Sequence, residues 1–218
     1  MKAEALDLQP RETILKDGTR VLFRPIQPAD KASLQHGLAQ LSPESRYRRF
    51  FAPIDHLSDE QLEYFTEVDQ VNHVAWVAIL PDLAGSPLVG VARYVRLAND
   101  PEAAEAAVTV IDAHQGKGIG RALLRVLAEV AIKGGVKRFT LFVLSENETM
   151  MGLMHEAGAI SDGFQGGVHQ LHVTLPDSVE GLDETAAPRV LKVAAAGQIQ
   201  GEVSPGRLGT RFMVGKHR

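Results

Sequence analysis

The chain has 218 residues, of which 44% are hydrophobic and 23% charged, with no cysteine and a formal net charge of −4. This composition is typical of a globular protein, and the acidic balance argues against nucleic acid, whose partners need a basic surface. A chain without cysteine has no disulfides, thiolate metal site or cysteine nucleophile. The N-terminus lacks a signal-peptide pattern and no apolar run reaches the length of a membrane helix, so we expect a cytoplasmic protein. We also expect that the protein uses no metal.

The N-terminal part is predicted to form one strand followed by helices. A turn precedes an apolar strand at about 20–24, and a helix is expected from 28 to 40. Ser42, which precedes Pro43, and Ser58 are capping hydroxyls that mark further helix starts. We interpret this region as two helices. The arginines at 46, 48 and 49 are assigned to a solvated helix face.

The middle of the chain is predicted to be strands. The nearly continuous apolar run at 74–80, a turn, and the run at 88–97 indicate an antiparallel pair. Another turn is expected at 99–102 and a third strand at 106–111. Trp76 is expected to lie in the core, since tryptophan in such a run packs inward more often than it binds a ligand.

A strand, a glycine loop, a helix and a strand follow one another between residues 106 and 143. The helix at 119–134 has its apolar residues on one face and ends at a glycine pair; a strand is expected at 139–143. A further helix is predicted at 145–158 and a last strand at 168–175. We expect one α/β domain over residues 1–175, followed by a 176–218 tail that is an extra hairpin or partly disordered.

The loop between the 106–111 strand and the next helix reads Gln115-Gly116-Lys117-Gly118-Ile119-Gly120-Arg121. Glycines there let the backbone approach an anion, and the helix N-terminus adds its positive dipole end, so a phosphate is the expected occupant. The loop lacks the Gly-Lys-Ser/Thr of a Walker A motif. Its GxGxG spacing also departs from the GxGxxG of a Rossmann fold, and a turn that serves packing remains an alternative.

The pattern Gln115-x-x-Gly118-x-Gly120 resembles the acyl-CoA loop of GNAT N-acetyltransferases. The segment 147–159 is similar to the helix that follows in that family. Two N-terminal segments, Arg24-Pro25-Ile26 and the stretch at 41–51, resemble the GNAT domains of bacterial protein lysine acetyltransferases. The resemblance implies a GNAT fold: a mixed, mostly antiparallel sheet splayed around a central βαβ unit, with helices on both faces.

The resemblance also implies acetyl-CoA as the acyl donor, with its pyrophosphate on the loop and its pantetheine arm along the preceding strand. The cofactor-binding residues are then Val110, Ile111, Gln115, Gly116, Lys117, Gly118, Ile119, Gly120, Arg121 and Asn147. The acceptor is an amine, which is protein lysine or a small molecule. The apolar-rich tail is a candidate surface for a homodimer.

Acyl transfer needs a neutral amine, whereas a lysine-like amine is protonated at neutral pH, so a base is expected. The resemblance places this base at Glu105, which shares a strand face with residues 107, 109 and 111. Asp112, His114 and His155 are rival bases. The family's tyrosine, which protonates the leaving thiolate, is replaced by Met154. An acyl-CoA-binding sensor with little turnover is therefore the alternative to an N-acetyltransferase.

Overall fold

The computed structural model describes residues 6, 8–146, 151, 155 and 158–183. The predicted cofactor contact Asn147 and the tyrosine-equivalent position Met154 lie outside these residues, as does the 184–218 segment of the tail. The strands are β1 Arg11–Ile14, β2 Arg20–Pro25, β3 His73–Ile79, β4 Leu88–Leu97, β5 Asp100–Val110, β6 Arg138–Leu144, β7 Ile160–Gln165 and β8 Val168–Thr174. The α-helices are α1 Lys31–Ala39, α2 Pro43–Phe50, α3 Asp59–Thr66 and α4 Ile119–Lys133, and the 3₁₀ turns are η1 Pro28–Asp30, η2 Asp112–His114 and η3 Glu180–Asp183.

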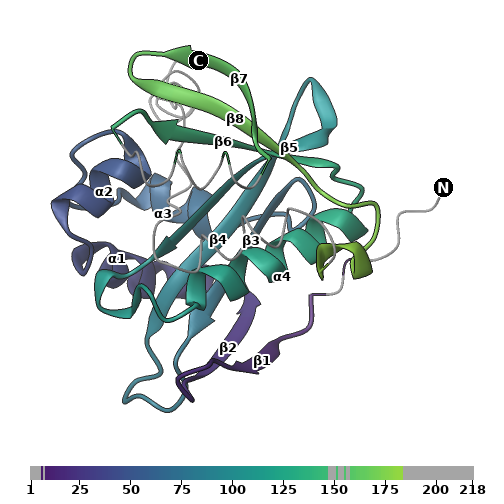
Figure 1. The fold of residues 1–218 in the computed structure, drawn as a ribbon. Helices are drawn as coiled ribbons and strands as arrows, with labels where there is room; N and C mark the ends of the chain where they lie inside the picture. Colours follow the sequence, from purple (N-terminus) through teal and green to yellow (C-terminus); the bar gives the residue numbers. More distant parts are fainter. Residues whose placement is uncertain (1–5, 7, 147–150, 152–154, 156–157, 184–218) are drawn as a thin grey trace.

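The eight strands form one mixed sheet in the order β1-β2-β3-β4-β5-β6-β8-β7 (Figure 1). Every neighbouring pair is antiparallel except β5 and β6, which the crossover helix α4 connects in parallel. The predicted βαβ unit is therefore confirmed, and it lies inside an otherwise antiparallel sheet. Trp76 is fully buried on β3, as expected.

The sheet splays between β5 and β6. These strands pair over three positions only, from Ala103 opposite Arg138 to Glu105 opposite Thr140. Beyond that point β5 continues its pairing with β4 as far as Val110, and β6 continues with β8 as far as Leu144. A gap in the ladder consequently opens at Glu105 and extends towards the end of β5.

The helices cover both faces of the sheet. A side chain at Gly90 of β4 would meet Leu123 of α4 and Val110, whereas a side chain at Gly37 of α1 would meet Ile111. Adjacent strand residues point to opposite faces, so α4 lies on the Val110 face and α1 on the Ile111 face. Figure 1 shows α4 across the front of the sheet and α1, α2 and α3 grouped together at one side.

Local capping explains where the helices begin. The Ser42 hydroxyl accepts a hydrogen bond from the Ser45 N–H (3.1 Å) at the start of α2. Ser58 and Gln61 form a reciprocal capping box at the start of α3. Both predicted cap residues therefore act as caps, and each such bond stabilises its helix by about 1 kcal/mol.

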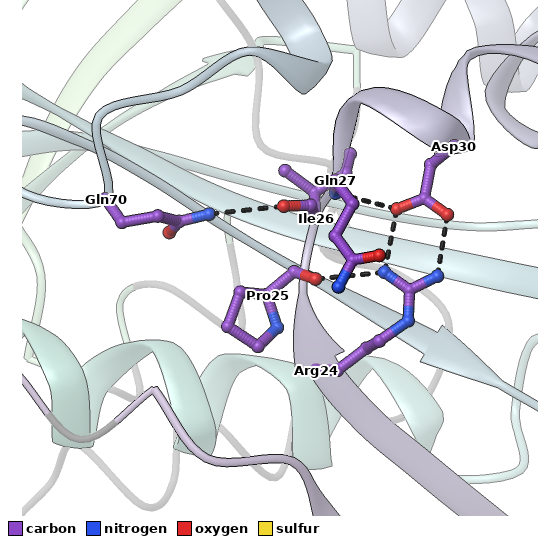
Figure 2. A network of polar contacts seen from close by, with 6 residues as sticks. All are labelled: Arg24, Pro25, Ile26, Gln27, Asp30 and Gln70. Carbon is purple, nitrogen blue, oxygen red and sulfur yellow. Dashed lines mark hydrogen bonds and ion pairs between the residues drawn. The ribbon is translucent and has the colours of Figure 1, made fainter.

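An ion pair fixes the chain between β2 and α1 (Figure 2). Arg24 donates to both carboxylate oxygens of Asp30, at 2.8 and 2.6 Å, and also to the Pro25 carbonyl at 3.0 Å. Asp30 is buried and accepts a further hydrogen bond from the Gln27 N–H (2.8 Å). The Arg24-Pro25-Ile26 segment thus serves to anchor the start of α1.

Three predictions about the fold are wrong. The N-terminal part holds three α-helices where two were expected, because both serine caps start helices of eight residues. The turn predicted at 99–102 is a strand from Asp100 onward, since this segment pairs with β4. Arg49 does not face solvent: it is only 6% exposed, because its face of α2 packs against the sheet.

Candidate functional site

The glycine loop follows β5 and leads into α4. Gly116 and Gly118 have φ values of +75° and +93°, in the left-handed region that favours glycine. A Cβ atom built on either residue meets no atom within 4 Å. Glycine is therefore favoured at both positions by the positive φ and not by crowding, and the space beside both residues is open to a ligand.

The start of α4 presents backbone donors to this space. Gly118 is the N-cap residue and supplies no side-chain cap. The first N–H groups of a helix have no intrahelical acceptor, and they carry the positive end of the helix dipole. Lys117 adds a formal positive charge, and its side chain is exposed. Exposed backbone donors, a helix N-terminus and a lysine charge together favour a phosphate or another anion at this position.

Asp112 holds the loop to the N-terminus of α2. One of its carboxylate oxygens accepts a hydrogen bond from the Ser42 N–H (2.8 Å), and the other accepts from the Ser45 hydroxyl (2.8 Å) and from Gln115 Nε2 (2.9 Å). Gln115 Nε2 also donates to the Val110 carbonyl at 2.9 Å. Asp112 is thus engaged as a structural anchor, although it was considered as a rival base.

Val110 and Ile111, the two residues at the end of β5 that are predicted to contact the pantetheine arm, point their backbone N–H and C=O groups in opposite directions. The Ile111 N–H donates to the Val89 carbonyl (3.0 Å), and the Ile111 carbonyl accepts from the His114 N–H (2.9 Å). Successive residues of a strand point their backbone N–H and C=O groups to opposite sides, and those of Ile111 point to the β4 side. Those of Ala106, Val108 and Val110 therefore point towards the gap between β5 and β6.

Glu105 lies at the point where β5 and β6 separate. It is the last β5 residue that pairs with β6, and its side chain is half-buried. Alternation places it on the same face of β5 as Ala107, Thr109 and Ile111. This face is covered by the N-terminal helices, so Glu105 lies at the edge of the layer between them and the sheet.

A partly open cavity of about 70 Å³ lies in that layer. Its walls are the N-terminal helices on one side and β4 and β5 on the other. The β5 residues Ala107, Thr109 and Ile111 contribute to its lining, together with Val89, Val91 and Arg93 of β4. Ala107 follows Glu105 by two residues on one strand face, which is about 7 Å. Glu105 is not part of the lining, but it is a near neighbour along the strand of Ala107, which is.

The cavity contains two buried arginines and a buried hydroxyl. Arg49 and Arg93 are 6% and 7% exposed. Arg93 donates to His73 Nε2 (3.0 Å) and to the Phe65 carbonyl (3.3 Å), and its guanidinium lies over the Phe65 ring at 4.4 Å. The buried Oγ1 of Thr109 has no hydrogen-bond partner among the described residues.

Burial and mutual repulsion shift the protonation equilibria of this group. Burial, followed by the nearby charge of Arg49, lowers the pKa of Arg93 to about 9. Burial, followed by the charge of Arg93, lowers the pKa of His73 to about 3, so His73 is neutral near pH 7. Its Nε2 is therefore the acceptor, because a guanidinium can only donate.

Three further observations concern metal ligands, membrane helices and the rival bases in the part of the chain that the structure describes. No group of three or more histidine, aspartate or glutamate side chains there is arranged to hold a metal ion. None of the helices seen is long and apolar enough to cross a membrane. Of the rival bases, His114 has a pKa lowered by burial and by Lys117, and His155 is exposed.

The sequence predicted a site at the loop and Glu105, but it did not predict the cavity. Of the polar residues that line the cavity, Arg93 is the one that the sequence pattern could have revealed, because it lies between Ala92 and Tyr94 in the middle of an apolar run. A charged residue at the centre of a buried strand is rare unless it is paired. Arg49 and Thr109 carry no comparable pattern in the sequence.

Comparison with known proteins agrees with this geometry. The sequence model of the Acetyltransferase (GNAT) family matches residues 41–159. The acetyltransferase Pat of Mycolicibacterium smegmatis is 34% identical over 169 residues, which are 78% of this chain and 50% of that protein. This chain thus spans about half the length of that curated relative.

Solved structures show the same fold. The GNAT domain of S. lividans PAT is 35% identical, with a TM-score of 0.68 over 76% of this chain and 97% of that domain. A Salmonella typhimurium protein whose structure contains its cofactor acetyl-CoA is 19% identical, with a TM-score of 0.54 over 72% and 95% of the two chains, and it shares the fold. With a family match over more than half of its length, and with these relatives, the chain belongs to the GNAT family of acetyltransferases.

Proposed function

We propose that the protein is an acetyl-CoA-dependent N-acetyltransferase that acts on an amine, either a protein lysine or a small molecule. One observation carries the proposal: an anion-binding loop with open space beside Gly116 and Gly118 adjoins a gap in the sheet that begins at Glu105. The diphosphate and the reactive thioester of one extended ligand occupy the two ends of this path.

The loop residues Gln115 to Arg121 bind the diphosphate through backbone N–H groups, and Lys117 contributes its charge. The pantetheine arm enters the gap between β5 and β6, where Ala106, Val108 and Val110 offer backbone groups as a partner strand would. The Gln115 side chain, which already binds the Val110 carbonyl, holds the loop against the end of β5. Asn147 is retained as a further contact to this arm on the strength of the sequence motif.

Glu105 acts as the general base. It removes a proton from the ammonium form of the acceptor, and the neutral amine nitrogen attacks the thioester carbonyl. The new N–C bond forms, the C–S bond breaks, the nitrogen gives up its second proton to solvent, and the coenzyme leaves as a thiolate. Because Met154 stands where the family has tyrosine, this thiolate takes its proton from water. A thiol pKa near 8.5 makes unassisted departure feasible.

The test compares two glutamates on the same strand. Glu105→Gln should lower kcat/KM by about 10² or more with lysine peptides and small amines, because the base is removed. Glu102→Gln is the matched control, since Glu102 is exposed and pairs with Lys137 at 2.6 Å, and its activity should equal that of the wild type. Coenzyme release is followed by a thiol reagent.

Equal rates for the two variants would refute the assignment of Glu105. Tight binding of CoA with no turnover of any amine would favour the alternative, an acyl-CoA sensor with a GNAT fold.

A further inference from the structure

The mechanism proposed above leaves Arg49 and Arg93 without a role. They are the only charged residues in the lining of the cavity within the described part of the chain. Burying a guanidinium is costly unless an anion or several good acceptors compensate it. Arg93, which is buried beside open space, therefore needs an explanation.

The contacts of Arg93 do not neutralise its charge. Its acceptors are an imidazole nitrogen and a backbone carbonyl, and its third contact is the face of a phenylalanine ring. No carboxylate of the described residues pairs with it. The hydrogen-bonded His73 is neutral, so it adds no negative charge. The groups that hold this guanidinium are therefore all neutral.

The cavity offers one more polar group and limited room. The Thr109 hydroxyl, buried and without a partner among the described residues, lies on the lining of the same cavity. A volume of about 70 Å³ is several times what one water molecule needs, so a group of a few non-hydrogen atoms fits. The remaining lining is mainly aliphatic and aromatic, which suits a small planar anion attached to a carbon chain.

We propose that this cavity is a carboxylate subsite of the acyltransferase, in which Arg93, Arg49 and Thr109 bind a carboxylate carried by one of the two reactants. Arginine binds carboxylates through paired N–H groups, and the threonine hydroxyl can donate as well. The carboxylate belongs either to the amine acceptor or to a dicarboxylic acyl chain on the thioester. This inference rests on the proposed function and names its substrate class.

The position of the subsite fits this chemistry. Arg93 lies opposite Ala107 in the β4–β5 register, and Ala107 is two residues from the proposed base Glu105. The backbone positions of Glu105 and Ala107 are therefore about 7 Å apart along the strand, which places the base and the subsite in neighbouring positions that one small reactant can span. A reactant with a charge at each end would fill both places at once.

The test uses matched substrates in two arms. In the first arm, lysine is compared with cadaverine, which is lysine without its carboxylate, and acetyl-CoA is the donor for both. In the second arm, succinyl-CoA is compared with acetyl-CoA on one uncharged amine. The wild type should favour the carboxylate-bearing member by about tenfold or more in kcat/KM in one arm, as expected of a hydrogen-bonded charge. The arm that responds identifies the source of the carboxylate.

Variants tie the preference to the cavity. Arg93→Met and Arg49→Met should abolish the preference, and Thr109→Val should reduce it while keeping the shape of the side chain. Arg48→Met is the matched control: Arg48 is on the same helix as Arg49, pairs with Glu44 at the surface and does not line the cavity. This control should keep the full preference. If Arg93→Met does not fold, the Thr109→Val and Arg49→Met variants show whether the cavity causes the preference.

Equal rates within twofold in both arms would overturn the subsite while leaving the acyltransferase intact. A preference that survives in Arg93→Met, or in both of the other cavity variants, would overturn it as well. If no amine is acylated, titration of succinate into the CoA complex decides the question. Binding that Arg93→Met loses and Arg48→Met keeps would support the subsite, and absence of binding would refute it.

Discussion

Two glycines with nearly the same positive φ angle separate a structural role from a ligand-binding role. Gly116 in the loop has φ +75°, and Gly85 in the turn between β3 and β4 has φ +76°. Both are exposed, and a Cβ on either would meet no atom within 4 Å. Alanine at either position therefore meets the same backbone strain and no clash.

The expected loss of stability is the same for the two variants. An L-residue at positive φ costs about 1–2 kcal/mol, so Gly116→Ala and Gly85→Ala should each lower the free energy of unfolding by that amount. For a domain of this size the midpoint of thermal unfolding falls by roughly 2–4 °C per kcal/mol. Urea titration followed by circular dichroism measures the loss.

Only one of the two variants should affect the coenzyme. The new methyl group of Gly116→Ala occupies the space proposed for the diphosphate, so the Kd for CoA should rise by about tenfold or more. The Kd of Gly85→Ala should stay within twofold of the wild type. Calorimetric titration of CoA into both variants measures this. Equal affinities would refute the ligand-binding role of the loop, and unequal stabilities would refute the argument from matched geometry.

Three further changes test other parts of the account. Asp112→Ala removes two hydrogen bonds that join the loop to the N-terminus of α2 and one within the loop, so the free energy of unfolding should fall by about 2–4 kcal/mol. A loss below about 0.5 kcal/mol in urea titration would contradict the anchor role. Arg24→Met leaves the buried Asp30 without its ion-pair partner and should lower the free energy of unfolding by about 3 kcal/mol. Arg20→Met, at an exposed pair with Asp82, should cause no measurable loss of stability. Similar losses in the two variants would show that the Arg24–Asp30 pair is dispensable. His73 has a pKa near 3 when folded and an ordinary value near 6.5 when unfolded, so stability falls as the pH drops through this window, by about 2 kcal/mol at pH 5. His73→Gln should lose this dependence, and a wild type whose urea midpoint does not change between pH 7 and pH 5 would refute the burial argument.

The central part of the fold was predictable because local signals and packing agree there. The loop glycines, the serine caps at 42 and 58 and the apolar face of α4 are each short-range patterns, and the structure confirms the elements that they predict. The splay of the sheet was predicted only from the family resemblance. No local pattern encodes where β5 and β6 stop pairing.

The edge strands and the cavity were not predictable in the same way. All six residues of β7 are exposed, so the strand has no alternation of buried and exposed residues to reveal it. β1 is a four-residue edge strand with one half-buried position. Arg49 is one of three arginines in α2, and only the packing of that helix against the sheet buries it. Local sequence does not specify these tertiary effects.

The central claim is that backbone groups of the loop bind the diphosphate of coenzyme A. The direct measurement is calorimetric titration of the wild type and Gly118→Glu with CoA, with pantetheine, which lacks the diphosphate, and with NAD. The wild type should bind CoA at least tenfold more tightly than pantetheine or NAD, and Gly118→Glu should lose most of the affinity for CoA because a carboxylate then faces the diphosphate. Equal binding of CoA and pantetheine, tighter binding of NAD, or undiminished CoA affinity in Gly118→Glu would contradict the claim.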